Sequence, residues 1–253
     1  MQVYKLGKQP ARFDHRTLRL ARYVSKLPQP PLEPSWVTHV NNWPMYMNDQ
    51  IGDCAIAGAA HCDEQWLQYA NPGGASPGVV MLNDNQVLKA YMDISGYTPG
   101  DPSTDTGCVL LDVLKYWRKR GIGGHKIDAF VSVNPKNLQE VAQAIWLFGN
   151  VYVGLMLPLA AQGADAWTVS DGGVHTEQGA PGSWGGHCVM VPAMSPKTLT
   201  CITWGERLKM SHNFWLDYVD ECYVALSQEW MEKNGSAPSG FDFVLLANDL
   251  EAL

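Results

Sequence analysis

The chain has 253 residues, of which 46% are hydrophobic and ten are tryptophan, a composition typical of a folded protein with a substantial core. The net charge of −7 argues against nucleic-acid binding by the main body of the protein. Six cysteines without a CxxC pair argue against a disulfide scaffold and a structural zinc site, so we expect no metal and no cofactor. No stretch has the pattern of a signal peptide or a membrane span, and we expect a cytoplasmic protein without membrane contact.

The basic charge is concentrated at the start of the chain. Residues 1–26 hold seven Lys or Arg and one Asp, about +6, whereas the rest of the chain is near −13. Arginines at three- and four-residue steps favour a short helix in this arm, which is either a solvated tail or a segment that docks on an acidic partner or on a second copy. The Pro-rich stretch that follows predicts a stiff linker. We therefore expect an arm and linker over residues 1–34 and one domain over residues 35–253.

After the linker, helical patterns come first and strand patterns later, an order that predicts an α+β fold. Apolar spacing predicts helices over 54–69, 84–95, 108–119, 137–148 and, after a capping Ser211, 212–221. In the second helix we expect the core-facing residues to be Val87, Leu88, Tyr91 and Met92. Strands are predicted over 126–133, 151–157, 187–193, 199–204 and 222–226, with a long Gly-rich loop over 163–186. The domain then has a helical half, about 48–125, and a sheet half, about 126–230.

Cys54 stands at the start of the first predicted helix, directly after Gly52 and Asp53, which we interpret as a turn and a helix cap. The positive end of a helix favours an anion, so a thiol there has a lowered pKa and becomes a nucleophile. A buried structural cysteine fits the same position. A thiolate nucleophile needs a base, and His187, which opens an apolar strand after two glycines, is the best of seven histidines for that role.

Several stretches of the chain, in order, resemble those of the papain-like cysteine peptidases. They are Asn-Asp-Gln-Ile-Gly-Asp-Cys at 48–54, Thr-Asp-Thr-Gly-Cys-Val at 104–109, Gly-Asn-Val-Tyr-Val-Gly at 149–154, Gly-Gly-His-Cys-Val-Met-Val at 185–191 and Thr-Trp-Gly at 203–205. The resemblance implies a helical subdomain that carries the cysteine, packed against an antiparallel sheet or half-barrel that carries the histidine. It also implies that Cys54 is the nucleophile and His187 the general base and acid.

The resemblance implies further site residues, with two departures from the family pattern. The family's oxyanion glutamine lies six residues before the nucleophile, where this chain has Asn48, while Gln50 lies four before it; either amide fits the role. The family's orienting asparagine is replaced by Ile202, which cannot hydrogen-bond to a ring nitrogen, so the orienting group is Thr203 or a backbone carbonyl. The residues expected to line the substrate cleft are Asp105, Gly107, Trp184, Gly186 and Trp204.

These residues predict a cysteine hydrolase or acyltransferase that acts on a peptide or amide bond, with a peptide or protein as its substrate. Because the orienting asparagine is absent, the alternative prediction is a catalytically weakened papain-fold structural or accessory component of a bacteriophage particle. The Thr-Trp-Gly form resembles the bacteriophage and prophage branch, which implies a bacterial host cytoplasm or a virion. A cell-wall amidase is a third interpretation. Acidic residues near the third helix are expected to cap turns rather than to hold calcium: Asp101, Asp105 and Asp112.

Overall fold

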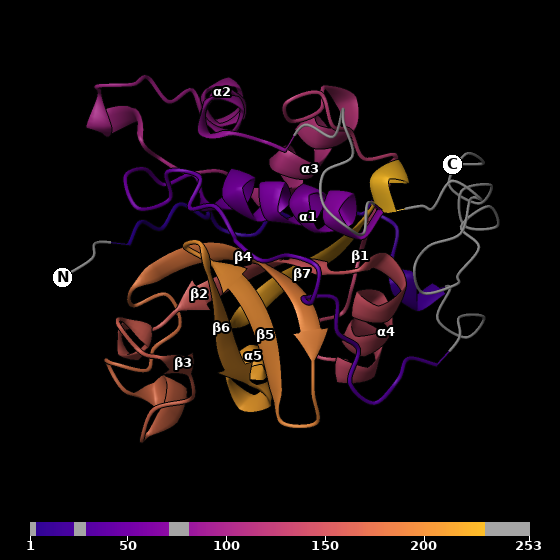
Figure 1. Cartoon of the computed structure of the whole chain (residues 1–253). Helices are drawn as coiled ribbons and strands as arrows, with labels where there is room; N and C mark the ends of the chain where they lie inside the picture. The colour runs from indigo at the N-terminus through magenta and orange to yellow at the C-terminus, as the bar shows by residue number, and fades with distance from the viewer. Residues whose placement is uncertain (1–3, 23–28, 71–80, 231–253) are drawn as a thin grey trace.

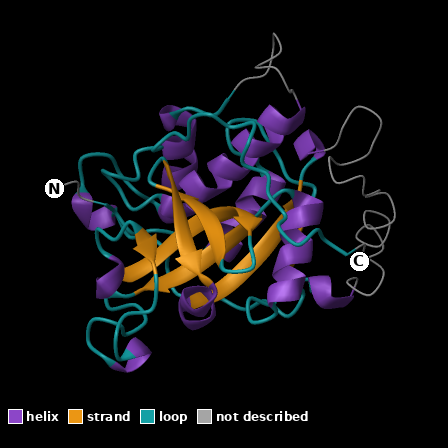
Figure 2. Cartoon of the chain, turned by 60° about the horizontal axis from the view of Figure 1, so that its bottom comes forward, coloured by secondary structure: helices purple, strands orange, loops and turns teal. Residues whose placement is uncertain are grey.

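The structure, a computed structural model, describes residues 4–22, 29–70 and 81–230, and it confirms the α+β fold. The first three helices lie on one side of a single sheet (Figure 1), and Figure 2 shows the strands as one twisted layer in the middle of the molecule. The helices are α1 (Cys54–Ala70), α2 (Asp84–Ser95), α3 (Leu110–Lys119), α4 (Leu138–Phe148) and α5 (His212–Tyr218). The strands are β1 (Ala129–Ser132), β2 (Val151–Leu157), β3 (Ala166–Trp167), β4 (Gly185–Met194), β5 (Thr198–Thr203), β6 (Glu206–Ser211) and β7 (Val219–Leu226).

The described strands form one sheet in the order β1-β7-β2-β4-β5-β6-β3. Neighbouring strands are antiparallel, as expected, except that the short β3 pairs with β6 in parallel. In the centre of the sheet, Leu155 of β2 lies opposite His187 of β4. The pairing of β2 with β7 is interrupted by a bulge, because Gly154 is opposite Glu221 whereas Leu155 is opposite Val219. A bulge of this kind changes the direction in which neighbouring side chains point.

Helix α1 approaches the sheet closely because small residues form the face that contacts it. A Cβ atom on Gly58 would lie 3.1 Å from the Cys188 sulfur and 3.3 Å from the Tyr152 ring, so any larger residue requires these neighbours to move. The Tyr152 hydroxyl donates a hydrogen bond to the Ala55 carbonyl at 2.7 Å. These contacts fix the first turn of α1, and with it Cys54, over the central strands.

Helix boundaries follow local capping signals. Asn83 forms a capping box with Gln86 at the start of α2, and Gly96, with φ of 79°, ends that helix. Ser211 caps α5 as predicted, since its side chain accepts a hydrogen bond from the Phe214 N–H. The prediction that Met92 faces the core is wrong, because Met92 is 37% exposed.

Several predicted boundaries differ from the structure. Helix α3 begins at Leu110, because Cys108 forms a bridge with Lys8 instead of entering the helix. Helix α5 ends at Tyr218, so Asp220 and Glu221 lie on β7 and not on the helix. Strand β6 was not predicted, and it pairs with β5 across a tight turn.

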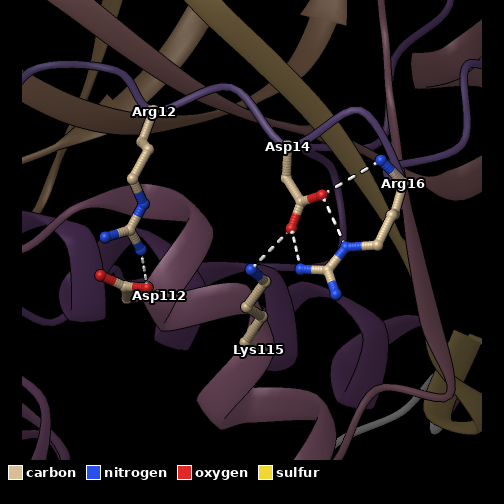
Figure 3. Close-up of polar contacts among 5 residues, drawn as sticks. All are labelled: Arg12, Asp14, Arg16, Asp112 and Lys115. Carbon is tan, nitrogen blue, oxygen red and sulfur yellow. Dashed lines mark hydrogen bonds and ion pairs between the residues drawn. The ribbon is translucent and has the colours of Figure 1, made fainter.

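The basic arm folds back onto its own chain, where it runs beside the helices and then toward β1 (Figure 1). We expected a short helix in this arm, and within the described residues its helical part is the 3-10 helix Leu20–Arg22. Two ion pairs join the arm to α3 (Figure 3): Arg12 with Asp112, and Asp14 with Lys115 at 2.9 Å. Docking of the arm on another protein or a second copy, and the division of the chain at residue 34, stay predictions.

Candidate active site

Cys54 is the first residue of α1, and its side chain is buried. Burial raises the pKa of the Cys54 thiol to about 12, and hydrogen bonding from the backbone N–H groups of Cys188 and Gly7 opposes this rise. Cys188 directly follows His187 on β4, so the thiol lies against the strand that carries the histidine. Gly7 belongs to the start of the chain, which also reaches the thiol.

His187 is buried in β4 with its two ring nitrogens in different surroundings. Its Nε2 lies 2.7 Å from the Thr203 Oγ1, while its Nδ1 has no hydrogen-bond partner among the described residues. The Trp204 ring stacks on the imidazole with centroids 4.4 Å apart, and Trp167 approaches edge-on at 6.4 Å. Because burial excludes water, the pKa of His187 falls to about 3. The imidazole is therefore neutral at physiological pH, held through one nitrogen and free at the other.

Trp204 reaches His187 through the tight turn between β5 and β6. Thr203 pairs with Glu206, so the turn is the dipeptide Trp204-Gly205, with φ values of 48° and 75°. Two successive positive φ values are typical of a type I′ hairpin turn, a conformation that is unfavourable for a bulky residue. Ile202 is fully buried, and the hydroxyl beside the His187 ring belongs to the next residue, Thr203.

Of the two amides predicted for the oxyanion, Asn48 is buried and Gln50 is exposed. Asn48 is 2% exposed, and its Nδ2 lies 3.3 Å from the Ile51 carbonyl oxygen and 3.4 Å from that of Lys5. The expected cap by the Asp53 side chain is absent, since both carboxyl oxygens lack a hydrogen bond of normal geometry among the described residues. Burial raises the pKa of this carboxyl, and the Asn48 amide opposes the rise.

The groove beside Cys54 is filled by residues 4–9 of the same chain, which we call the N-terminal segment. Its backbone pairs with both walls: the Lys8 N–H donates to the Gly186 carbonyl at 3.0 Å, and the Cys108 N–H donates to the Gly7 carbonyl at 2.8 Å. A Cβ atom on Gly107 would lie 1.9 Å from the Gly7 oxygen, and one on Gly186 would lie 2.2 Å from the Lys8 oxygen. These two glycines, both expected in the cleft, therefore flank a bound stretch of polypeptide.

Aromatic rings cover one end of the N-terminal segment. Tyr4 stacks on Trp204 at 4.3 Å, and the Trp204 indole N–H donates to the Lys5 carbonyl at 3.3 Å. Trp184 adjoins these rings, with its own ring 5.7 Å from that of Trp204. Both tryptophans expected in the cleft therefore lie at this end of the groove.

Asp105, also expected in the cleft, holds the groove wall in place through hydrogen bonds to Gly52 and Tyr91. Its carboxylate accepts hydrogen bonds from the Gly52 N–H at 3.0 Å and from the Tyr91 hydroxyl at 2.5 Å. The same hydroxyl accepts a hydrogen bond from the Gly107 N–H at 2.9 Å. Asp105 thus joins the turn before α1 to the opposite wall.

The sequence interpretation missed three residues of the site. Lys8 is buried, and its Nζ lies 2.7 Å from the Asp220 Oδ2 and 3.4 Å from the Glu221 Oε1. The opposite charges of the basic arm and the acidic domain were the one signal that pointed to such a contact.

Among the described residues, no cluster of His, Cys, Asp or Glu is arranged to hold a metal ion. None of the helices in the same part of the chain is both long and apolar enough to cross a membrane.

Together, these observations define a papain-like fold in which a cysteine at a helix start lies against a strand that carries a histidine. The structure is similar to xylellain, a cysteine protease from Xylella fastidiosa, with a TM-score of 0.66 and 11% identity over 89% of this chain and 97% of that one. It is also similar to digestive procathepsin L2 proteinase from Tenebrio molitor larval midgut (TM-score 0.61, 11% identity, 89% and 79% covered). A third similar structure is procathepsin B from Trypanosoma congolense (TM-score 0.52, 12% identity, 89% and 87% covered).

The similarity confirms the predicted fold, which these structures share with the chain at very low sequence identity. No family model matches the sequence, and neither does any curated protein. The bacteriophage branch and the cytoplasmic or virion location stay predictions.

Proposed function

We propose that the chain is a papain-like cysteine hydrolase of peptide or amide bonds, with Cys54 as the nucleophile and His187 as the general base and acid. The observation that carries this proposal is the groove beside Cys54, which holds an extended polypeptide through backbone hydrogen bonds to Gly186 and Cys108. A groove that pairs with main chain positions a peptide substrate without regard to most of its side chains. A thiol at the floor of such a groove is held close to the bonds of that peptide.

In the proposed reaction, His187 takes the thiol proton through Nδ1 while Cys54 Sγ attacks the substrate carbonyl carbon. The negative oxygen of the tetrahedral intermediate accepts hydrogen bonds from the Cys54 backbone N–H and the Asn48 amide. The C–N bond then breaks, the amine leaves with the proton from His187, and the acyl group stays on Cys54 as a thioester. Water, deprotonated by His187, releases the acid and restores the thiol. Thr203 holds the ring through Nε2 during both steps.

We propose further that the described form is the closed form of this hydrolase. The N-terminal segment fills the groove, and burial keeps both groups neutral, with a pKa of about 12 for the Cys54 thiol and about 3 for His187. Departure of the segment admits water, which removes the burial penalty on both charged forms. The start of α1 then favours the thiolate, and the imidazolium forms beside it.

Peptide hydrolysis by an opened full-length chain tests this proposal. The Gly7→Ala substitution is expected to displace the N-terminal segment, for reasons given in the Discussion, and the opened chain should hydrolyse a mixed peptide library. Adding Cys54→Ala should abolish turnover, and adding Cys62→Ala, which alters another buried cysteine of α1, should not. Turnover that survives Cys54→Ala, or no turnover by an opened chain whose Cys54 alkylates freely, would contradict the proposal.

The filled groove and Ile202 at the family's asparagine position also favour the second candidate, a papain-fold structural component of a bacteriophage particle. This candidate predicts no Cys54-dependent hydrolysis even when the groove is open. It also predicts that charge reversal of the arm changes the assembly state of the full-length chain in sedimentation. An unchanged assembly state together with measurable turnover would contradict it.

A further inference from the structure

The side chain of Lys8 occupies a buried pocket beside the proposed catalytic groove, and the pocket ends at Asp220, whose side chain is 31% exposed. The side chain is 0% exposed, and its Nζ contacts the Asp220 carboxylate at 2.7 Å and the Glu221 carboxylate at 3.4 Å. The Met156 sulfur lies 3.9 Å from the same nitrogen. A buried ammonium group is stable only when its charge is compensated, so this pocket is built for a cation.

The pocket crosses three neighbouring strands of the sheet. The Lys8 backbone is held by Gly186 of β4, the side chain passes over Gly154 of β2, and the ammonium group ends on β7. A Cβ atom on Gly154 would lie 2.3 Å from the Lys8 Cε, so the missing side chain of Gly154 opens the passage. The pocket therefore accepts a long, unbranched side chain that comes from the groove.

The bulge in β7 supplies two adjacent carboxylates at the end of the pocket. Because Asp220 is the extra residue of the bulge, it and its neighbour Glu221 both reach the Lys8 ammonium group. The Tyr223 hydroxyl donates a hydrogen bond to Glu221 Oε2 at 3.1 Å, which leaves Oε1 for the cation. Burial raises the pKa of Glu221, and the charge of Lys8 opposes that rise. Two carboxylates this close repel each other when no cation lies between them.

We propose that this pocket selects the substrate, and that it takes the lysine or arginine side chain of a peptide once Lys8 has left it. The inference rests on the proposed function, because it names the substrate class of that hydrolase. Lys8 adjoins Gly7, which lies against the Cys54 thiol. The basic residue of the substrate therefore lies close to the bond that is cut, and Lys8 is the internal competitor for its place.

Labelling of the full-length Lys8→Ala chain tests the inference. This substitution removes the internal cation and leaves Asp220 and Glu221 in place. The probes are peptidyl acyloxymethyl ketones that differ only in carrying Lys, Leu or Glu near the reactive carbon, with Cys54 modification measured by mass spectrometry. We expect the Lys probe to label Lys8→Ala at least about tenfold faster than the Leu probe, as one partly buried ion pair allows. The matched control is Lys5→Ala, since Lys5 lies on the same segment; it should label as slowly as the unmodified chain.

Neutralising the two carboxylates tests the selectivity of the pocket independently of the proposed hydrolase activity. In the Lys8→Ala chain, adding Asp220→Asn and Glu221→Gln keeps the shape and removes the charge, so the Lys and Leu probes should label Cys54 at similar rates. Equal labelling by both probes in Lys8→Ala itself would contradict substrate selection by the pocket without contradicting the proposed hydrolase function.

If no probe labels Cys54 in any variant, the proposed function fails and the pocket is judged by binding. Butylammonium chloride should then raise the melting temperature of Lys8→Ala more than sodium chloride does, and the Asp220→Asn and Glu221→Gln changes should remove the difference. No difference between the two salts would overturn the pocket as well.

Discussion

Replacing Gly7 by alanine should open the groove without altering any residue of the proposed catalytic machinery. A Cβ atom at this position would lie 1.7 Å from the Gly52 carbonyl oxygen and 2.3 Å from the Gly52 carbonyl carbon. Both atoms belong to the backbone at the turn before α1, so no side-chain rotation relieves the overlap. The N-terminal segment must therefore move away from Cys54.

The size of the effect follows from what holds the segment in place. Its main chain makes four hydrogen bonds to other main-chain groups within the described residues: Lys5 N–H to Asn48 O, Lys8 N–H to Gly186 O, Cys108 N–H to Gly7 O and Gln9 N–H to Cys108 O. At about 1 kcal/mol net for each bond, they favour the closed form by about 4 kcal/mol, or about 10³-fold. Because a thiol reacts only from the open form, Gly7→Ala should raise the alkylation rate of Cys54 by up to about 10³-fold.

The assay is alkylation by iodoacetamide at neutral pH, with Cys54 modification followed by peptide mapping. Gly100→Ala is the control, since a Cβ atom at Gly100 would meet nothing within 4 Å, and the positive φ of Gly100, 89°, makes alanine at least as unfavourable for the backbone there as at Gly7. That variant should label as slowly as the unmodified chain. If Gly7→Ala labels Cys54 no faster than Gly100→Ala while keeping its circular dichroism spectrum, the N-terminal segment does not seal the thiol.

Three further predictions concern the histidine and its neighbours. In the opened chain, Thr203→Val should lower the turnover number by roughly 10–100-fold, because His187 loses a buried hydrogen bond, and Thr203→Ser should restore most of it; equal loss in both variants would contradict an orienting role. Burial lowers the pKa of His61 to about 4 and that of His187 to about 3, from 6.5. The unfolded chain therefore protonates these two histidines first, and their contribution to stability is full above about pH 6.5 and falls steadily toward pH 3. In urea unfolding, the stability difference between the unmodified chain and His187→Gln should shrink as the pH falls through this range; a difference that does not change with pH would refute this. Trp204→Ala should raise the pKa of His187 toward its ordinary value, as followed by NMR titration, whereas Trp204→Phe should change it little.

The parts of the fold that depend on local pattern were predictable from the sequence. The small residues after Cys54, the apolar spacing over 84–95 and the cap Ser211 predicted α1, α2 and the start of α5, because periodicity and capping act within a few residues. The bulge that takes Asp220 and Glu221 into β7 was not predictable, since it depends on pairing with β2. Local apolar spacing alone extended the helix through both residues.

For the candidate site, the sequence suggested residue types but could not suggest their geometry. Motif order pointed to Cys54 and His187, but the choice between Thr203 and a backbone carbonyl depends on a turn with two positive φ values. The choice between Asn48 and Gln50 likewise depends on which side chain faces the groove. The N-terminal segment contacts strands that follow it by more than 170 residues, and no local pattern reports such a pairing.

Because the N-terminal segment and the groove belong to one polypeptide, the segment acts as a tethered ligand at an effective concentration of about millimolar or more. A single cut in the connection between the segment and residue 29 would turn it into a free peptide, diluted to the concentration of the protein itself. Opening of the groove would then be irreversible. The ion pairs of Arg12 and Asp14 with α3 would set the rate at which the cleaved peptide dissociates.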